Sequence, residues 1–293
     1  MIEVKQLSKI YSNGKGIFDV GFRVHEGEVF GFLGPNGAGK TTTIRVLLGF
    51  TNPTQGSCRI NGLDCRAQTE VIQRQLGYVP GEIAFFENMT GMQFMQFMAD
   101  MRGTTDITLR DRLIERFELE SDRKIRKMSK GMKQKVGLIT AFMHDPAVLI
   151  LDEPTSGLDP LMQRRFVELI REERGRGKTV LMSSHMFDEV DRTCERAAII
   201  REGRIVAVED IASLKSSLRK SYLVTVADAL DVEKIKSSGL EHQQLDEHRV
   251  EIFISNDYHK MLTTLAGCQV TSLDAPAQAL EQTFIRFYGK GVS

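Results

Sequence analysis

A glycine-rich segment at residues 34–41 has the residue types and the spacing of a phosphate-binding loop. Three glycines allow the backbone to curl so that successive N–H groups point inward at oxygen atoms, which bulky side chains would prevent. The following helix would direct its positive end at the same point. Lys40 is expected to reach the outer phosphates, and the Thr41 hydroxyl to ligate Mg²⁺. The predicted phosphate contacts are Gly34, Pro35, Asn36, Gly37, Ala38, Gly39, Lys40, Thr41 and Thr42.

Two adjacent carboxylates, Asp152 and Glu153, follow the apolar run Ala147–Leu151. A buried strand of this kind can place Asp152 beside the phosphate loop, where it would hold Mg²⁺. Side chains alternate along a strand, so Glu153 is expected to point elsewhere and to polarise an attacking water molecule. The competing interpretation is that the two acids only begin a turn before Pro154.

The elements that must position these residues alternate between strand and helix over residues 28–210, which predicts a parallel sheet covered by helices. Glu28–Leu33 is an expected strand that runs directly into the loop, and Lys40–Leu48 is an expected helix. Residues 1–33 contain candidate strands and turns that predict an antiparallel β subdomain. The fold class is therefore α/β, with a phosphate-loop NTPase core.

Residues 85–146 have a helical character, and Thr90 with Gln93 fits a capping box. The Met- and Phe-rich helix that follows either forms a core face or offers a docking surface for a partner helix. From about residue 220 a second, small α+β domain is expected, with a β-α-β-β-α-β order that suggests a ferredoxin-like fold. Leu280–Tyr288 is expected to form a closing amphipathic helix. The predicted boundaries are 1–215 and 220–293.

Composition narrows the class of function. Hydrophobic residues make up 41% and charged residues 27% of the 293 residues, as in ordinary soluble domains. Lys plus Arg equals Asp plus Glu, at 39 each, which disfavours nucleic acid as a partner. No run approaches the roughly 18 apolar residues of a spanning helix. The scattered cysteines indicate reduced thiols rather than a disulfide framework: Cys58, Cys65, Cys194 and Cys268.

Taken together, these segments resemble the nucleotide-binding domain of ABC proteins, and the resemblance covers residues 1 to about 210. Met128–Met132 stands where that family has its Leu-Ser-Gly-Gly-Gln signature, and Ser156–Asp159 matches its D-loop. The resemblance implies that Tyr11 stacks on adenine and that His185 contacts the γ-phosphate. It also implies ATP and Mg²⁺ as ligands. Considered alone, Tyr11 could be an ordinary aromatic and His185 a structural histidine.

The signature departs from the family pattern at three of its five positions, one of which is the apolar exchange of Leu for Met128. Ser129 and Gly131, which carry the family's hydroxyl and amide contacts to nucleotide, are kept, whereas Lys130 and Met132 replace Gly and Gln. Seven cations lie within residues 123–135, forming either a solvated face or a surface that attracts phosphate or anionic lipid.

A second departure concerns the family's Q-loop glutamine. At this position the chain has Gly81, followed by Glu82. Glycine has no side chain to reach a metal ion. Glu82 either takes over as a metal ligand or stays in solvent.

The resemblance further implies that two cassettes close head to tail, with Ser129 and Gly131 of one contacting the ATP held by Lys40 of the other. The closing stretch of the chain, Leu280–Ile285, is similar to that of exporter ATPases of the ABC-2 kind, including drug and peptide-antibiotic resistance pumps. The implied function is ATP hydrolysis that drives export through a separate membrane permease. The protein would then be cytoplasmic and peripheral on the inner face of the cell membrane. The alternatives are a non-transport ABC ATPase and a regulatory nucleotide-binding module.

Overall fold

The computed structural model describes residues 1–213, 220–254 and 258–274. The chain divides into two compact units, Met1–Ile211 and Ala212–Ser293. Each unit has a hydrophobic core of its own. Among the described residues, no helix combines the length and the apolar character needed to cross a membrane.

The centre of the first unit is a six-stranded sheet in the order β10-β9-β3-β8-β7-β6. Every residue of β3 and β7 is buried, as expected for strands of a parallel sheet that is covered on both faces. The pairs β9-β3, β3-β8, β8-β7 and β7-β6 are parallel. The predicted parallel sheet is thus confirmed, except that β10 adds an antiparallel edge. The strands are β3 (Val29–Leu33), β6 (Leu76–Val79), β7 (Val148–Asp152), β8 (Thr179–Ser184), β9 (Arg196–Arg201) and β10 (Arg204–Asp210).

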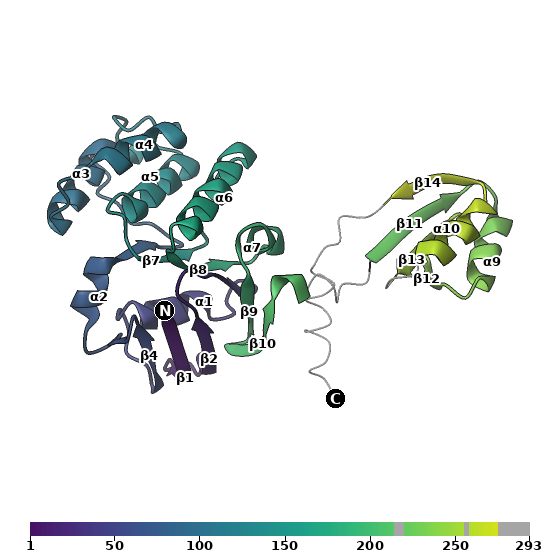
Figure 1. Cartoon of the computed structure of the whole chain (residues 1–293), viewed down its shortest axis with the longest axis horizontal. Coiled ribbons are helices and arrows are strands. Elements are labelled where there is room, and N and C mark those ends of the chain that lie inside the picture. Colours follow the sequence, from purple (N-terminus) through teal and green to yellow (C-terminus); the bar gives the residue numbers. More distant parts are fainter. Residues whose placement is uncertain (214–219, 255–257, 275–293) are drawn as a thin grey trace. The chain divides into compact units, whose positions relative to one another are not determined.

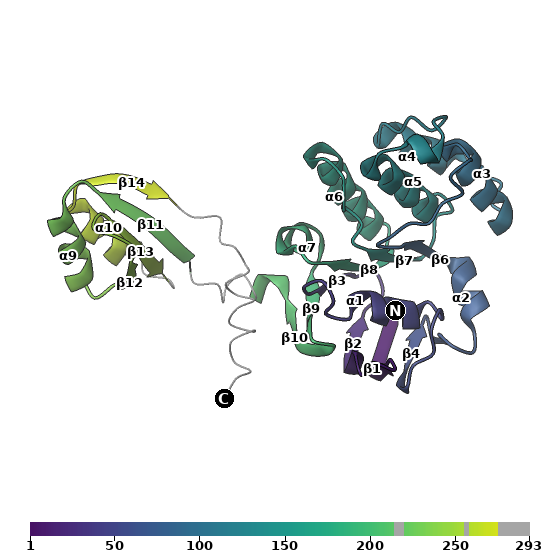
Figure 2. The same ribbon diagram turned by 180° about the vertical axis from the view of Figure 1, so that it is seen from behind.

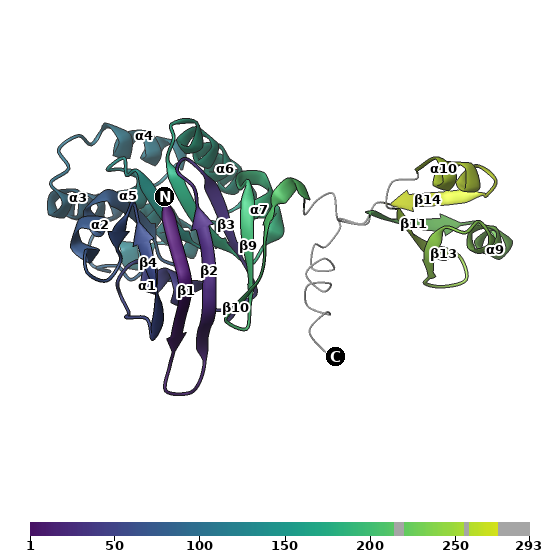
Figure 3. The ribbon, with the colours of Figure 1, turned by 60° about the horizontal axis from the view of Figure 1, so that its bottom comes forward.

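A four-stranded antiparallel sheet, in the order β2-β1-β4-β5, packs on the same core. The two sheets meet where β2 lies beside β9 and β10 (Figure 3). There the Phe18 N–H donates to the Gly203 carbonyl at 2.7 Å. This sheet is the predicted antiparallel subdomain, with strands β1 (Ile2–Ile10), β2 (Gly16–Val24), β4 (Gln55–Ile60) and β5 (Leu63–Asp64).

Figures 1 and 2 show α3, α4, α5 and α6 on one side of β7 and β8, with α1 and the antiparallel sheet on the other. Thr90 and Gln93 form the predicted capping box at the start of α3. The helix α5 begins at Lys130, because the Ser129 side chain caps it by accepting the Met132 N–H. The helices are α1 (Lys40–Leu47), α2 (Thr69–Gln75), α3 (Gly91–Arg102), α4 (Thr108–Arg116), a 3-10 turn (Ile125–Lys127), α5 (Lys130–Phe142), α6 (Pro160–Gly175) and α7 (Phe187–Thr193).

The second unit is an antiparallel sheet in the order β12-β13-β11-β14, with two helices whose apolar faces pack on it (Figure 1). Lys234 of α9 donates to the carbonyl of Gly267 beyond α10, and Lys260 of α10 donates to that of Gly239 beyond α9. The predicted helix at Leu280–Tyr288 lies outside the described residues. The elements are β11 (Lys220–Val226), α9 (Ala229–Ser237), β12 (Glu241–Gln244), β13 (Arg249–Ile254), α10 (Tyr258–Ala266) and β14 (Val270–Asp274).

Candidate nucleotide site

The glycine-rich loop connects β3 to α1, which is the strand-loop-helix context that its sequence requires. A Cβ on Gly34 would lie 2.3 Å from the Ile200 carbonyl oxygen, so no larger residue fits there. Gly39 caps α1 with a φ of 111°, a conformation that side-chain-bearing residues rarely adopt. Pro35, Asn36 and Gly37 at the tip are exposed. The loop therefore offers backbone N–H groups next to the N-terminus of a helix.

Lys40 is the first residue of α1, and its side chain is only 5% exposed. Its ammonium group donates to the Gly34 carbonyl at 2.6 Å and to the Pro35 carbonyl at 3.2 Å. The same nitrogen lies 3.1 Å from Oε1 of Glu153. A lysine carries three donors, so these contacts hold a point charge in the bend of the loop.

Asp152 ends β7 and is completely buried. Its Oδ2 accepts the hydroxyl proton of Thr41 at 2.8 Å, and its Oδ1 accepts that of Ser183 on β8. The carboxylate thereby joins the phosphate loop to two neighbouring strands. Mg²⁺ prefers hard oxygen ligands and is commonly held by one or two carboxylates together with substrate phosphates. The Thr41–Asp152 pair fits a site of that kind.

Glu153 begins the turn after β7, with a positive φ of 50°. The Glu153 side chain has other partners than Asp152, but strand alternation does not set its direction, because β7 ends at Asp152. Its Oε1 faces Lys40, whereas its Oε2 lies 2.6 Å from Nδ1 of His185. His185 follows β8 directly and is exposed. The fold thus joins Lys40, Glu153 and His185 in one chain of contacts.

The signature residues form a separate group at the start of α5. Ser129 is exposed, and its hydroxyl accepts the Met132 N–H at 3.2 Å. Lys130, which replaces the family's glycine, donates to the Ser156 hydroxyl at 2.9 Å. A Cβ on Gly131 would lie 2.5 Å from the Gly157 carbonyl oxygen. The signature therefore packs closely against the D-loop of its own chain.

Two residues predicted to bind nucleotide or metal, Tyr11 and Glu82, form no hydrogen bond or ion pair with Lys40, Asp152 or Glu153 across the residues that the structure describes. Tyr11 follows β1, is 38% exposed and has the Lys9 ammonium 5.5 Å from its ring centroid. Glu82 is exposed. The neighbouring Gly81 lies so close to Asp152 that a Cβ there would be 3.3 Å from Oδ2. The backbone at the Q-loop position thus lies beside the candidate metal ligand, whereas the Glu82 carboxylate is in solvent.

Sequence reasoning missed four residues that hold this site together. Ser183 binds Asp152, and its hydroxyl accepts the Glu153 N–H at 3.2 Å. Gln134 of α5 is buried and donates to the Pro154 carbonyl at 2.8 Å. Thr155 and Glu189 are buried partners behind the Glu153 turn. Ser183 ends the apolar run that begins at Val180, whereas Gln134, Thr155 and Glu189 lie among polar residues and carry no signal of this kind.

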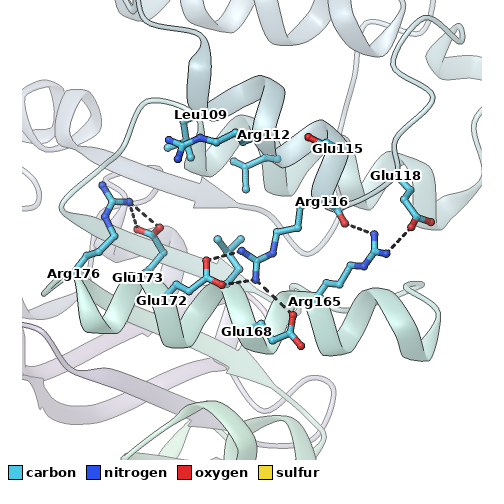
Figure 4. Close-up of a pocket in the computed structure, with 12 residues that line it drawn as sticks. Leu109, Arg112, Glu115, Arg116, Glu118, Arg165, Glu168, Glu172, Glu173 and Arg176 are labelled. Carbon is cyan, nitrogen blue, oxygen red and sulfur yellow. Dashed lines mark hydrogen bonds and ion pairs between the residues drawn. The ribbon is translucent and has the colours of Figure 1, made fainter.

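A cleft of about 960 Å³ lies between α4 and α6 and contains none of the predicted nucleotide residues. Figure 4 shows Arg116, Arg165 and Arg176 engaged with neighbouring groups. Arg116 of α4 forms two hydrogen bonds with Glu172 of α6, at 2.6 and 2.9 Å. Arg165 of α6 binds Glu118 and the Arg116 carbonyl. The ion pairs in this cleft connect α4 with α6.

Comparison with known proteins matches residues 17–156 to the ABC transporter family. The bacitracin transport ATP-binding protein BcrA of Bacillus licheniformis is 31% identical over 99% of this chain and 98% of its own length. The linearmycin resistance ATP-binding protein LnrL of Bacillus subtilis is 29% identical over 99% of each chain.

Solved structures agree with this match. The ATP-binding subunit of an ABC transporter has a TM-score of 0.67 and 33% identity, covering 73% of this chain and 92% of that one. A dimeric bacterial ABC transporter cassette has a similar fold, with a TM-score of 0.66 at 22% identity over 72% of this chain and 99% of that one. The chain therefore belongs to the ABC transporter family, as an ATP-binding cassette with ATPase activity.

Proposed function

We propose that two copies of this cassette, or one copy and a paired relative, hydrolyse ATP at composite sites and thereby drive export through a separate membrane permease. The observation that carries the proposal is the contact chain Lys40–Glu153–His185 beside the phosphate loop. It places a cation, a carboxylate and an imidazole at one point, as phosphoryl transfer to water requires.

In this proposal Lys40 and N–H groups of residues 36–42 bind the phosphates of ATP. Thr41 and Asp152 hold Mg²⁺, which would neutralise charge on the phosphates. Glu153 accepts a proton from the attacking water, and His185 contacts the γ-phosphate while holding Glu153 in place. Because Lys40 and His185 contact different oxygens of Glu153, they fix the orientation of its carboxyl group.

The other half of each composite site comes from the partner cassette. Ser129 and Gly131 are at an exposed helix start whose N–H groups suit an anionic ligand. In the described part of the chain they form no hydrogen bond with Lys40, Asp152, Glu153 or His185. Tyr11 would stack on adenine, since its ring is accessible beside the loop that follows β1.

The export part of the proposal comes from the relatives, which are named for bacitracin transport and linearmycin resistance. Both align over almost the whole of this chain, including residues 220–293, which we assign to an accessory domain that follows the cassette at 1–215. The permease would hold this chain on the inner face of the cell membrane. A regulatory module with little turnover is the less favoured alternative, because Glu153 is present and contacts both Lys40 and His185.

The test of the ATPase proposal is Glu153→Gln, which keeps the shape of the side chain but removes the base. Hydrolysis should fall about 100- to 10,000-fold while ATP still binds. ATP should then trap the variant as a dimer in gel filtration. The control is Glu195→Gln, because Glu195 pairs with Arg174 at the surface. Wild-type turnover together with a monomer in ATP would contradict the proposal.

The permease is tested separately, by purifying the tagged protein from gently solubilised membranes. We expect one integral membrane protein to accompany it in stoichiometric amount. Recovery of the cassette only from the soluble fraction would contradict the transport assignment and leave the ATPase assignment standing.

A further inference from the structure

Behind the nucleotide site lies a carboxylate that the proposed mechanism does not use. Glu189, on the short helix α7, is only 7% exposed. Its two oxygens accept protons from two hydroxyl groups, Oε1 from Thr155 and Oε2 from Ser184, each at 2.5 Å. Both hydroxyl-bearing residues are buried as well, with exposures of 3% and 0%.

Both hydroxyl partners of Glu189 lie next to residues of the proposed catalytic site in the sequence. Thr155 comes two residues after Glu153, and Ser184 comes immediately before His185. Glu189 therefore connects the turn after β7 with the turn after β8. On the nucleotide side, the same two turns are joined by the contact between Glu153 and His185.

Ser184 also reaches the phosphate loop. Its backbone carbonyl accepts the Gly34 N–H at 3.2 Å, and its hydroxyl accepts the Met186 N–H at 3.0 Å. A displacement of Ser184 would thus be felt by the first residue of the phosphate loop and by His185 together. A catalytic group misplaced by about 1 Å can lose about 100-fold in rate, so such a connection matters for hydrolysis.

We propose that Glu189 is a positioning residue of the ATPase, which holds the Glu153 turn and the His185 turn at the separation that catalysis needs. It acts through Thr155 and Ser184 and touches neither nucleotide nor water. The inference rests on the proposed roles of Glu153 and His185.

A purely stabilising role explains the arrangement less well. Burial of a carboxylate costs desolvation free energy, and it raises the pKa of the Glu189 carboxyl above its usual range. In the described residues, no lysine or arginine forms an ion pair with it. An apolar side chain would fill the same space without this cost. The two oxygens of Glu189 each accept one hydroxyl proton, an arrangement that an apolar side chain cannot provide.

The decisive variant is Glu189→Gln. The amide oxygen can accept one hydroxyl proton, but the amide nitrogen can only donate, so the bond to the other hydroxyl must reverse its direction. Both charge-assisted hydrogen bonds are then replaced by weaker neutral ones, which loosens the connection between the two turns. We expect the kcat of ATP hydrolysis to fall about 10- to 100-fold, the usual effect of losing an outer-shell partner. The KM for ATP should change less, within about threefold, because Lys40 and most of the loop N–H groups still bind the phosphates.

Glu173→Gln is a matched control, since Glu173 is also a buried carboxylate but pairs with Arg176 at the other end of α6. It should lose thermal stability without losing kcat. If Glu189→Gln behaves in the same way, with a lower melting temperature and normal kcat, the positioning role is refuted.

Thr155→Val and Ser184→Ala keep the carboxylate and remove one donor each, so they test the inference even if Glu189→Gln does not fold. Each should lower kcat. The double variant Glu189→Gln/Thr155→Val should be no slower than the slower single variant, because both changes break one connection. Additive losses would refute the inference.

Glu153→Gln is measured in the same assay, so the two ideas can fail separately. If Glu153→Gln retains its rate, the proposed function fails. If Glu153→Gln loses its rate but the Glu189, Thr155 and Ser184 variants do not, only the present inference fails.

Discussion

The phosphate side and the signature side of this cassette differ in how much of their environment a single chain supplies. On the phosphate side, the buried Lys40 side chain contacts Glu153, and the buried Asp152 side chain contacts Thr41. On the signature side, exposed Ser129 contacts only the backbone of its own helix, in the described residues. Folding alone therefore organises one half of the proposed site, whereas the other half presents a surface whose ligand must come with a second molecule.

Lys40→Ala should have the largest effect on this comparison, because it removes the cation on the prearranged side. Charge-assisted hydrogen bonds to phosphate contribute about 1.5–3 kcal/mol, which corresponds to a loss of about 10- to 150-fold in ATP affinity. Isothermal titration calorimetry with the single chain measures it. An unchanged affinity would remove Lys40 from the site.

Gly131→Ala tests the signature side with a smaller expected effect. The new Cβ would lie 2.5 Å from the Gly157 carbonyl oxygen, and overpacking of this kind costs about 1–3 kcal/mol. We expect kcat to fall about tenfold while the single chain binds ATP normally. Gly175→Ala is the control, since a Cβ there meets no atom within 4 Å. Weakened ATP binding by the isolated Gly131→Ala chain would mean that the two sides are not independent.

Glu82→Ala sharpens the comparison at the Q-loop position, where the backbone adjoins Asp152 but the carboxylate is in solvent. We hypothesise that Glu82 assists metal binding only when the permease is present. The dependence of ATPase rate on Mg²⁺ concentration should therefore match wild type for the chain alone and shift to higher Mg²⁺ with the permease. Curves that superimpose in both conditions would show that Glu82 plays no part.

Removal of residues 220–293 should leave the affinity for ATP unchanged. Every predicted nucleotide residue precedes Arg201, and each unit has its own core. We expect transport or assembly in cells to change instead. If the truncated protein keeps its circular dichroism spectrum but loses ATP binding, the assigned boundary is wrong.

Local patterns in the sequence predicted most of the fold. The apolar runs that end at Leu33 and Leu151 became fully buried parallel strands, and Thr90 with Gln93 formed its capping box. Such features depend on residues close together in the chain. The strand β10 follows β9 after a tight turn at Glu202-Gly203, and a connection this short makes the pair antiparallel, unlike the rest of the sheet.

The site was harder to predict, because its supporting contacts join distant segments. Ser183 lies 31 residues from Asp152, and Glu189 lies 34 from Thr155. A serine at the end of a strand and an acid on a seven-residue helix carry no sequence pattern that names their partners. The contacts of Glu153 with Lys40 and His185 also depend on the tertiary fold, because Glu153 lies beyond the end of β7 with a positive φ. Sequence motifs identify the residues that are proposed to bind the ligand, whereas only the tertiary fold shows which residues support them.

The ion pairs between α4 and α6 have a mechanical consequence. α6 begins at Pro160, directly after the D-loop, and has 16 residues, so it is a rod of about 24 Å. Near its far end, Glu168 and Glu172 hold Arg116 of α4 (Figure 4). A tilt of about 5° at the D-loop would therefore move that end by about 2 Å. Such a movement of α6 would be transmitted to α4 through the ion pairs of Arg116.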